Sequence, residues 1–294
     1  ASMVVLAANA GGAWSPIGDV TTIMLWIDEQ VTTVPIITHV ILPSLVTMIV
    51  PLLILTFTVK GNVTKPVLEN GEHHEFTTAF ERKLLLIMGV SALLFVPVFK
   101  TITHLPPYMG MLFGLGVIWS TTEIIHRKKP LEDKRKLTVI GCLKKVDVPT
   151  IFFFLGILSA VAALQSMGHL NLLAQYLDEN VKDIYVINII IGVLSAIVDN
   201  VPLVAGAMGM YEIAPAGSVG YDAFFMQDGQ FWQFLAYCAG TGGSMLIIGS
   251  AAGVAAMGLE KIDFIWYAKR ISFLAFIGYI AGAATYYIQM QIIG

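Results

Sequence analysis

Two glycine-rich segments interrupt long apolar stretches, and this pattern constrains the fold more than any other feature of the chain. The first covers residues 9–19 and the second residues 240–250, and each position of the first lies 231 residues before its counterpart in the second. Within a membrane, interrupted helical backbone is tolerated only where it is buried in protein or lines a cavity. The pair therefore predicts two broken membrane helices in corresponding halves of the fold, with a binding site at the breaks.

The composition places the chain in a bilayer. Hydrophobic residues make up 56% and charged residues 13%, with a mean hydropathy of +0.77, whereas about a quarter of a soluble domain is charged. Eight of the seventeen Lys and Arg lie between Arg127 and Lys145, so the net charge of -3 is uneven and indicates no nucleic acid partner. The two cysteines, Cys142 and Cys238, predict no disulfide framework.

Apolar stretches of about 20 residues can cross the hydrocarbon core as helix, and they predict an all-α polytopic membrane protein. The expected spans are 2–27, 34–59, 84–99, 107–125, 148–166, 230–258 and 271–290, and residues 184–210 form an eighth, interrupted element. Three prolines, Pro35, Pro43 and Pro51, are interpreted as kinks because the apolar run continues through them.

Basic loops set the expected orientation, because Lys and Arg stay on the cytoplasmic side. Residues 126–147, here called the basic loop, are placed inside, and counting back places 60–83 inside and Asp28–Glu29 outside. A full crossing by 184–210 would put the acidic loop 211–229 inside, against the charge rule. We therefore expect 184–210 to be a re-entrant hairpin, which makes the two broken helices run in opposite directions, as inverted repeats do.

This interpretation divides the chain into three segments. Residues 1–125 hold the remainder of a first repeat and connecting transmembrane helices, 126–147 the basic cytoplasmic loop, and 148–294 a second inverted repeat with the hairpin and the broken helix 230–258. The counterpart of Asp199 at the same offset would fall before residue 1. We therefore expect an N-terminally truncated chain whose missing N-terminal segment is one of its partners.

Asp199 is the leading candidate for ion chemistry. It follows a mostly apolar run, and an ionised carboxylate at mid-membrane would cost about 2.5–3.5 kcal/mol without compensation. Pro202 lacks an N–H and disfavours helix at the preceding residue, so the turn leaves carbonyls beside Asp199 and Asn200. Carboxylate, amide and carbonyl oxygens suit a small hard cation. The alternative is that Asp199 only caps the second half-helix.

Asp19 follows the first break and is the second candidate, ranked lower because capping the next helix explains it well. Further oxygens on the same element come from Asn9, Ser15, Thr21 and Thr22. The second break offers hydroxyls in place of acids, at Thr241, Ser244 and Ser250. Close glycine packing between helices is the alternative there.

Two other groups of residues carry weaker signals. Glu72-His73-His74-Glu75 could hold a metal or sense pH, but it lacks zincin spacing and a solvated loop is favoured. Seven aromatic residues are expected at the membrane interfaces: Trp26, Trp119, Trp232, Trp266, Tyr267, Tyr286 and Tyr287.

The breaks and the turn carry a family resemblance. Residues 8–19, Val198-Asp199-Asn200-Val201-Pro202 and Gly240-Thr241-Gly242-Gly243-Ser244 closely resemble NhaD-type sodium/proton antiporters of the ion transporter superfamily. The resemblance covers the whole chain, as the later part of such an antiporter without its first helices and first hairpin. It implies exchange of Na⁺ or Li⁺ for H⁺ across the bacterial inner membrane, or a plastid envelope in plants, by an inverted-repeat fold.

The resulting hypothesis is a secondary antiporter in which Asp199 alternately holds a proton or Na⁺. Na⁺ would be held at Asp199, Asn200 and Thr241, with Ser244 completing the coordination and Asp19 as a second titratable group. Asn9 and Ser15 are further candidates, and the structural breaks are assigned to Gly11, Gly12, Pro16, Pro202, Gly242 and Gly243. No cofactor is expected beyond the transported ions Na⁺, Li⁺ and H⁺.

Rival functions remain open at this point. A sodium-coupled carboxylate or anion carrier would aim half-helix N-termini at its substrate, but two acids and no Lys or Arg at the breaks argue against it. A cation channel is a rival from a different class. An intramembrane enzyme would need a nucleophile with a base, or a metal triad, and no such set is present, so no enzyme is expected. Besides the lipid bilayer, a homodimer partner is left open.

Overall fold

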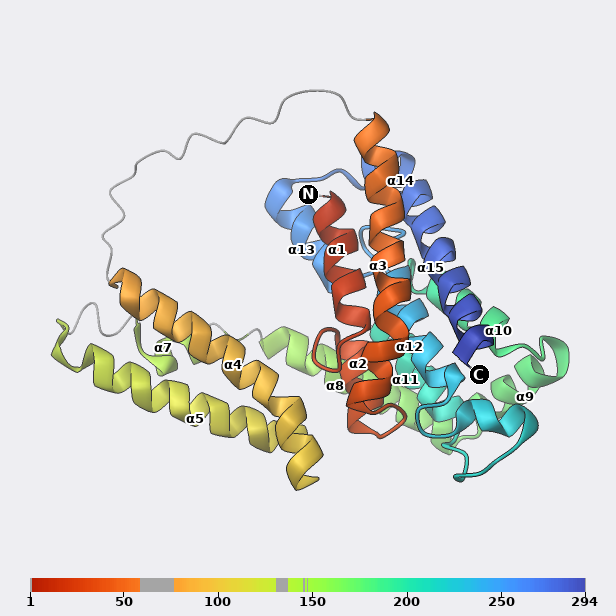
Figure 1. Ribbon diagram of the computed structural model, residues 1–294, viewed down its shortest axis with the longest axis horizontal. Coiled ribbons are helices and arrows are strands. Elements are labelled where there is room, and N and C mark those ends of the chain that lie inside the picture. Colours follow the sequence, from red (N-terminus) through yellow and green to blue (C-terminus); the bar gives the residue numbers. More distant parts are fainter. Residues whose placement is uncertain (1, 59–76, 131–136, 145, 147, 294) are drawn as a thin grey trace. The chain divides into compact units, whose positions relative to one another are not determined.

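The computed structural model describes residues 2–58, 77–130, 137–144, 146 and 148–293. Within these ranges the regular elements are all helical (Figure 1). They are α1 Ser2–Ala13, α2 Val20–Ile27, α3 Thr33–Thr58, α4 Ala79–Thr103, α5 Pro107–Ile125, η1 His126–Lys128, α7 Val139–Leu143, α8 Val148–Ser166, α9 His169–Asn180, α10 Ile184–Leu194, α11 Asn200–Met210, η2 Gly220–Phe225, α12 Gln230–Gly242, α13 Ala251–Glu260, α14 Phe264–Arg270 and α15 Ser272–Ile293.

The helices confirm an all-α multi-pass membrane protein. Among the described residues, α3, α4, α5 and α15 are long and apolar enough to cross a membrane, and Leu155–Ser166 passes the same test together with α9, from which it is bent by 73°. The two expected breaks are present, because α1 and α2 replace one continuous helix and α12 and α13 replace another. Residues 184–210 form α10 and α11, which both pack against α12. Their re-entrant course stays a prediction.

The chain forms two compact units, residues 1–60 with 154–294, and residues 61–153. The first unit joins the two ends of the chain because α1 packs against α12 and α3 packs along α15. This grouping by contact differs from the expected division at 125 and 147. That division follows membrane topology and stays a prediction.

Helix α12 is the centre of the first unit. Every residue from Phe231 to Gly242 is buried, and α1, α3, α10 and α15 pack around the helix. Glycine allows the closest approach, since a side chain on Gly242 would collide with the backbone carbonyl of Gly192 in α10. Small residues at such crossings let helix backbones pack closely, as is common in membrane proteins.

Helix α3 stays continuous through its prolines. Pro43 and Pro51 lie inside the helix, as expected, and Pro35 lies in its first turn. Pro43 has no N–H, so the carbonyl of His39 one turn earlier loses its helical partner. The Nε2 of Gln289 in α15 donates to that carbonyl at 3.2 Å, and the neighbouring helix thus satisfies the group that proline leaves.

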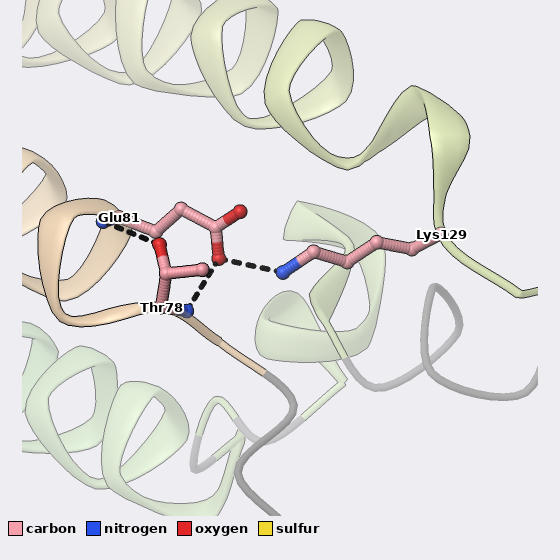
Figure 2. A network of polar contacts seen from close by, with 3 residues as sticks. All are labelled: Thr78, Glu81 and Lys129. Atoms are coloured by element: carbon pink, nitrogen blue, oxygen red, sulfur yellow. Dashed lines mark hydrogen bonds and ion pairs between the residues drawn. The ribbon is translucent and has the colours of Figure 1, made fainter.

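In the second unit, α4 packs against α5. Thr78 caps α4 through a reciprocal pair of bonds with Glu81, and the Nζ of Lys129 lies 2.6 Å from the Glu81 carboxylate (Figure 2). The start of α4 and the start of the basic loop therefore lie at the same end of the unit. This agrees with placing 60–83 and 126–147 on one side of the membrane.

The prediction that seven aromatic residues lie at the membrane interfaces is wrong for four of them. Those four side chains are buried in the protein and use their polar atoms there. They are Trp26, bonded to Thr33, Trp232, bonded to the Phe225 carbonyl, Tyr267, bonded to the Ser244 carbonyl, and Tyr286, bonded to the Gln230 carbonyl. These internal hydrogen bonds offset the cost of removing the Tyr O–H and Trp N–H groups from water. Trp266 and Tyr287 are about half exposed, at 50% and 47%.

The structure describes the cysteines and the possible metal-binding segment only in part. Cys238 is a buried free thiol, whereas the side chain of Cys142 lies outside the described residues. The Glu72–Glu75 segment also lies outside them.

Candidate functional site

The two glycine-rich breaks have the same local structure. A Cβ on Gly12 would lie 2.9 Å from the carbonyl oxygen of Gly18, and a Cβ on Gly243 would collide with the carbonyl oxygen of Gly249. These pairs are equivalent at the offset of 231 residues. The turn hydrogen bonds correspond as well: Gly18 N donates to Ser15 O and Gly249 N to Leu246 O, each at 3.0 Å. The sequence repeat is therefore a repeat of backbone structure at the breaks.

Three helices begin at one cavity of about 320 Å³. Their N-cap residues are Asp19 for α2, Asp199 for α11 and Ser250 for α13, and all three line the cavity. The N-terminal end of a helix carries partial positive charge and favours nearby negative groups. Two of the three caps supply that negative charge as carboxylates.

Asp19 does more than its position at a helix start requires. Its carboxylate makes no side-chain capping bond to α2. Instead Oδ2 accepts from Thr21 Oγ1 at 2.7 Å and from Asn200 Nδ2 at 3.1 Å. Asp19 is therefore the N-cap residue of α2, as the sequence suggested, but a capping bond does not account for its carboxylate, which joins the first break to the α10–α11 turn.

Asp199 caps α11 and also lies in the lining of the cavity. Its Oδ1 accepts from the backbone N–H of Val201 at 3.3 Å, which is a capping bond. The residue also lines the cavity with Asp19 and Asn200. Pro202 lies in the first turn of α11, where a missing N–H removes no intrahelical bond.

Asn9 connects the two breaks. Its Nδ2 donates to Ser244 Oγ and to Ser250 Oγ, both at 2.9 Å, and the side chain is buried and lines the cavity. An amide nitrogen has two hydrogens, so these bonds use both and leave the amide oxygen as the acceptor. Ser244 thus acts on the cavity through Asn9 rather than as part of its lining.

Other predicted residues are not brought to the cavity lining. Thr241 Oγ1 donates to the carbonyl of Tyr237 one turn earlier at 2.6 Å, a bond that hydroxyls inside helices commonly make. Ser15 Oγ accepts from the N–H of Ile17 at 3.5 Å. Gly11 lies within α1, where an added Cβ would meet nothing within 4 Å, so the geometry gives it no part in the break. Ligand roles for Thr241 and Ser15 stay predictions.

The sequence alone did not identify Ser250 as a central residue of the site. One signal was present, because the offset of 231 maps Asp19 onto Ser250. Equivalent positions after equivalent breaks begin equivalent helices, and a serine is a preferred N-cap.

Residues 1–227 match the CitMHS family, which is described as Citrate transporter. The chain belongs to this family. Several relatives of this chain carry antiporter names. Sodium/proton antiporter 1 of Arabidopsis thaliana is 50% identical over 97% of the chain and 47% of the relative, and sodium/proton antiporter 2 of the same plant is 46% identical over 97% and 66%. The Na(+)/H(+) antiporter NhaD of Alkalimonas amylolytica is 32% identical over 96% and 59%.

These relatives confirm the resemblance to NhaD-type antiporters, and the protein is a membrane transporter homologue rather than an enzyme. The CitMHS chain spans about half to two thirds of the length of the curated relatives it matches. No solved structure matches it.

Proposed function

We propose that this chain forms the ion-exchange site of a secondary sodium/proton antiporter, in which Na⁺ and H⁺ compete for Asp19 and Asp199. One observation carries the proposal: both carboxylates line a single cavity with the side chains of Asn9, Asn200 and Ser250. A cation that binds the ionised carboxylates must leave when they are protonated. Competition at the same oxygens therefore couples the two ions during alternating access.

The oxygen donors fit a hard monovalent cation. Asn200 donates its Nδ2 to Asp19, and Asn9 donates to the two serines, so each amide can turn its oxygen to an ion. Carboxylate and carbonyl oxygens are the ligands that hard cations prefer. Two carboxylates in one cavity also allow a cycle to carry more than one proton per Na⁺. Li⁺, a smaller hard cation, is proposed as an alternative substrate.

The family description raises a second candidate, transport of citrate or a related carboxylate. Three helix N-termini at the cavity favour an anion. However, Asp19 and Asp199 occupy two of them, and their carboxylates repel a further negative charge in the same cavity. Among the described residues that line the cavity there is no Lys or Arg to compensate. The cavity therefore favours the cation.

The test uses the full-length protein in everted vesicles. Wild type should dissipate a proton gradient when Na⁺ is added, and Asp19→Asn and Asp199→Asn should each abolish this response, because an amide keeps the shape but cannot cycle a proton. Asp183→Asn is the matched control, since Asp183 caps α10 outside the cavity and Asn is an equally good cap. Near-normal exchange by either cavity variant, or uptake of labelled citrate without Na⁺, would overturn the proposal.

The organisms of the relatives bear on which membrane holds the protein. The bacterial inner membrane is one proposal and the plastid envelope the other. Identity to the two plant relatives, 50% and 46%, exceeds the 32% to the Alkalimonas protein. This difference favours the plastid envelope as the native site.

A further inference from the structure

Helices α2 and α11 run side by side and in the same direction away from the cavity between the breaks. They meet at their starts, where Asn200 bonds to Asp19, and they pack along their length. Further along, Met24 and Asp28 of α2 and Ala205 and Gly209 of α11 line a second cavity of about 220 Å³. The exchange site and this second cavity therefore lie at successive positions along one helix seam.

A thin apolar layer separates the two cavities. On α2 the first cavity reaches Ile23 and the second begins at Met24. On α11 the corresponding residues are Val201 and Ala205, one helical turn or about 6 Å apart. A short apolar constriction of this kind can close a pathway by excluding water.

The second cavity has a polar end formed by Asp28 of α2 and Gln165 of α8. Asp28 is the C-cap residue of α2, where a negative charge opposes the helix dipole. Its carboxylate is nevertheless held in place, because Gln30 Nε2 donates to Oδ2 at 2.7 Å and the Gln30 side chain is buried. Helix stability does not account for this acid, whereas attraction of a cation to the cavity does.

We infer that the second cavity is a peripheral binding site for a hydrated monovalent cation, and that Na⁺ moves between it and the exchange site along the α2–α11 seam. Asp28 raises the local cation concentration at the mouth. Met24 and Ala205 form the apolar layer that opens and closes. The inference rests on the proposed sodium exchange and adds to it a route and a residue outside the exchange site.

The first test measures Na⁺ dependence on the Asp28 side of the membrane, in proteoliposomes of the full-length protein. That side is defined as the one from which an impermeant thiol reagent labels Glu29→Cys. Asp28→Asn should raise the KM for Na⁺ on this side about two- to fivefold at low ionic strength with kcat unchanged. Choline chloride should shrink the difference, because salt screens exposed charges. Glu29→Gln, at an adjacent exposed acid outside this cavity, should raise KM less than Asp28→Asn does.

The second test measures the water accessibility of the α2–α11 seam by cysteine labelling and does not depend on transport. Single cysteines at Met24 and Met208 should react with a charged thiol reagent from the Asp28 side about tenfold faster than one at Ile27, because ionised thiols form in water and not in lipid. Ile27 is 53% exposed and lines neither cavity. Seam cysteines that react no faster than Ile27, or an unchanged KM in Asp28→Asn, would overturn the inference while wild-type exchange persists. Loss of exchange in wild type would instead refute the proposed function.

Discussion

Gly11 and Gly12 are neighbours in α1, yet alanine should have opposite effects at the two positions. A Cβ on Gly12 would lie 2.9 Å from the Gly18 carbonyl oxygen and 3.0 Å from Asp19 Cβ, so the turn would have to shift. Overpacking of this kind costs about 1–3 kcal/mol. A Cβ on Gly11 would meet nothing within 4 Å, and alanine there should stabilise the helix by about 0.5–1 kcal/mol.

The assay combines the melting temperature of the purified full-length protein with sodium-dependent proton exchange in everted vesicles. Gly12→Ala should melt at a lower temperature and exchange more slowly, because the shift moves the Asp19 carboxylate. Gly11→Ala should melt at a slightly higher temperature and exchange normally. Gly243→Ala is the counterpart in the second break and should resemble Gly12→Ala. A loss of stability in Gly11→Ala as large as in Gly12→Ala would refute the argument from break geometry.

Three further predictions test the site and the topology. Ser250→Ala removes a helix cap and an acceptor of Asn9, which should cost about 1–2 kcal/mol and appear as a lower melting temperature; an unchanged value would contradict the bond. The double variant Asp19→Asn with Asp199→Asn should lose sodium exchange and gain citrate binding by calorimetry, since three helix N-termini then face the cavity without carboxylates; absence of binding would count against that reading. Ser218→Cys should label from the side opposite the basic loop, and labelling from the same side would make the hairpin a full crossing.

Span positions could be predicted because hydropathy reports them directly. The expected spans 107–125 and 148–166 coincide with α5 and α8, since a continuous apolar run has no other stable form in a bilayer. Helix α9 was not predicted. It is amphipathic and only 12 residues long, and its chain enters through Gly168 at a positive φ of 76°, so it produces no apolar run of membrane length.

The candidate site was predictable in its residue types and only partly in its contacts. The repeat identified the breaks, and apolar surroundings identified Asp199 and Asp19. The bond from Asn200 to Asp19 spans 181 positions of sequence, and no local pattern encodes such a pairing. The hydroxyl of Thr241 bonds a carbonyl of its own helix. This contact depends on the side-chain rotamer, which the spacing of residues in the sequence does not determine.

If the proposed function holds, the arrangement of helix ends lets the same set of helices serve both a family described as citrate transporters and relatives named sodium/proton antiporters. Three helix N-termini converge on one cavity, and such ends intrinsically favour an anion. In this chain the anions are part of the protein, as the caps Asp19 and Asp199. The helix ends favour these two carboxylates, and in the proposed function the carboxylates in turn select a cation. On this proposal, the charge of the substrate depends on whether the cap residues carry a charge, and the surrounding helices need not change.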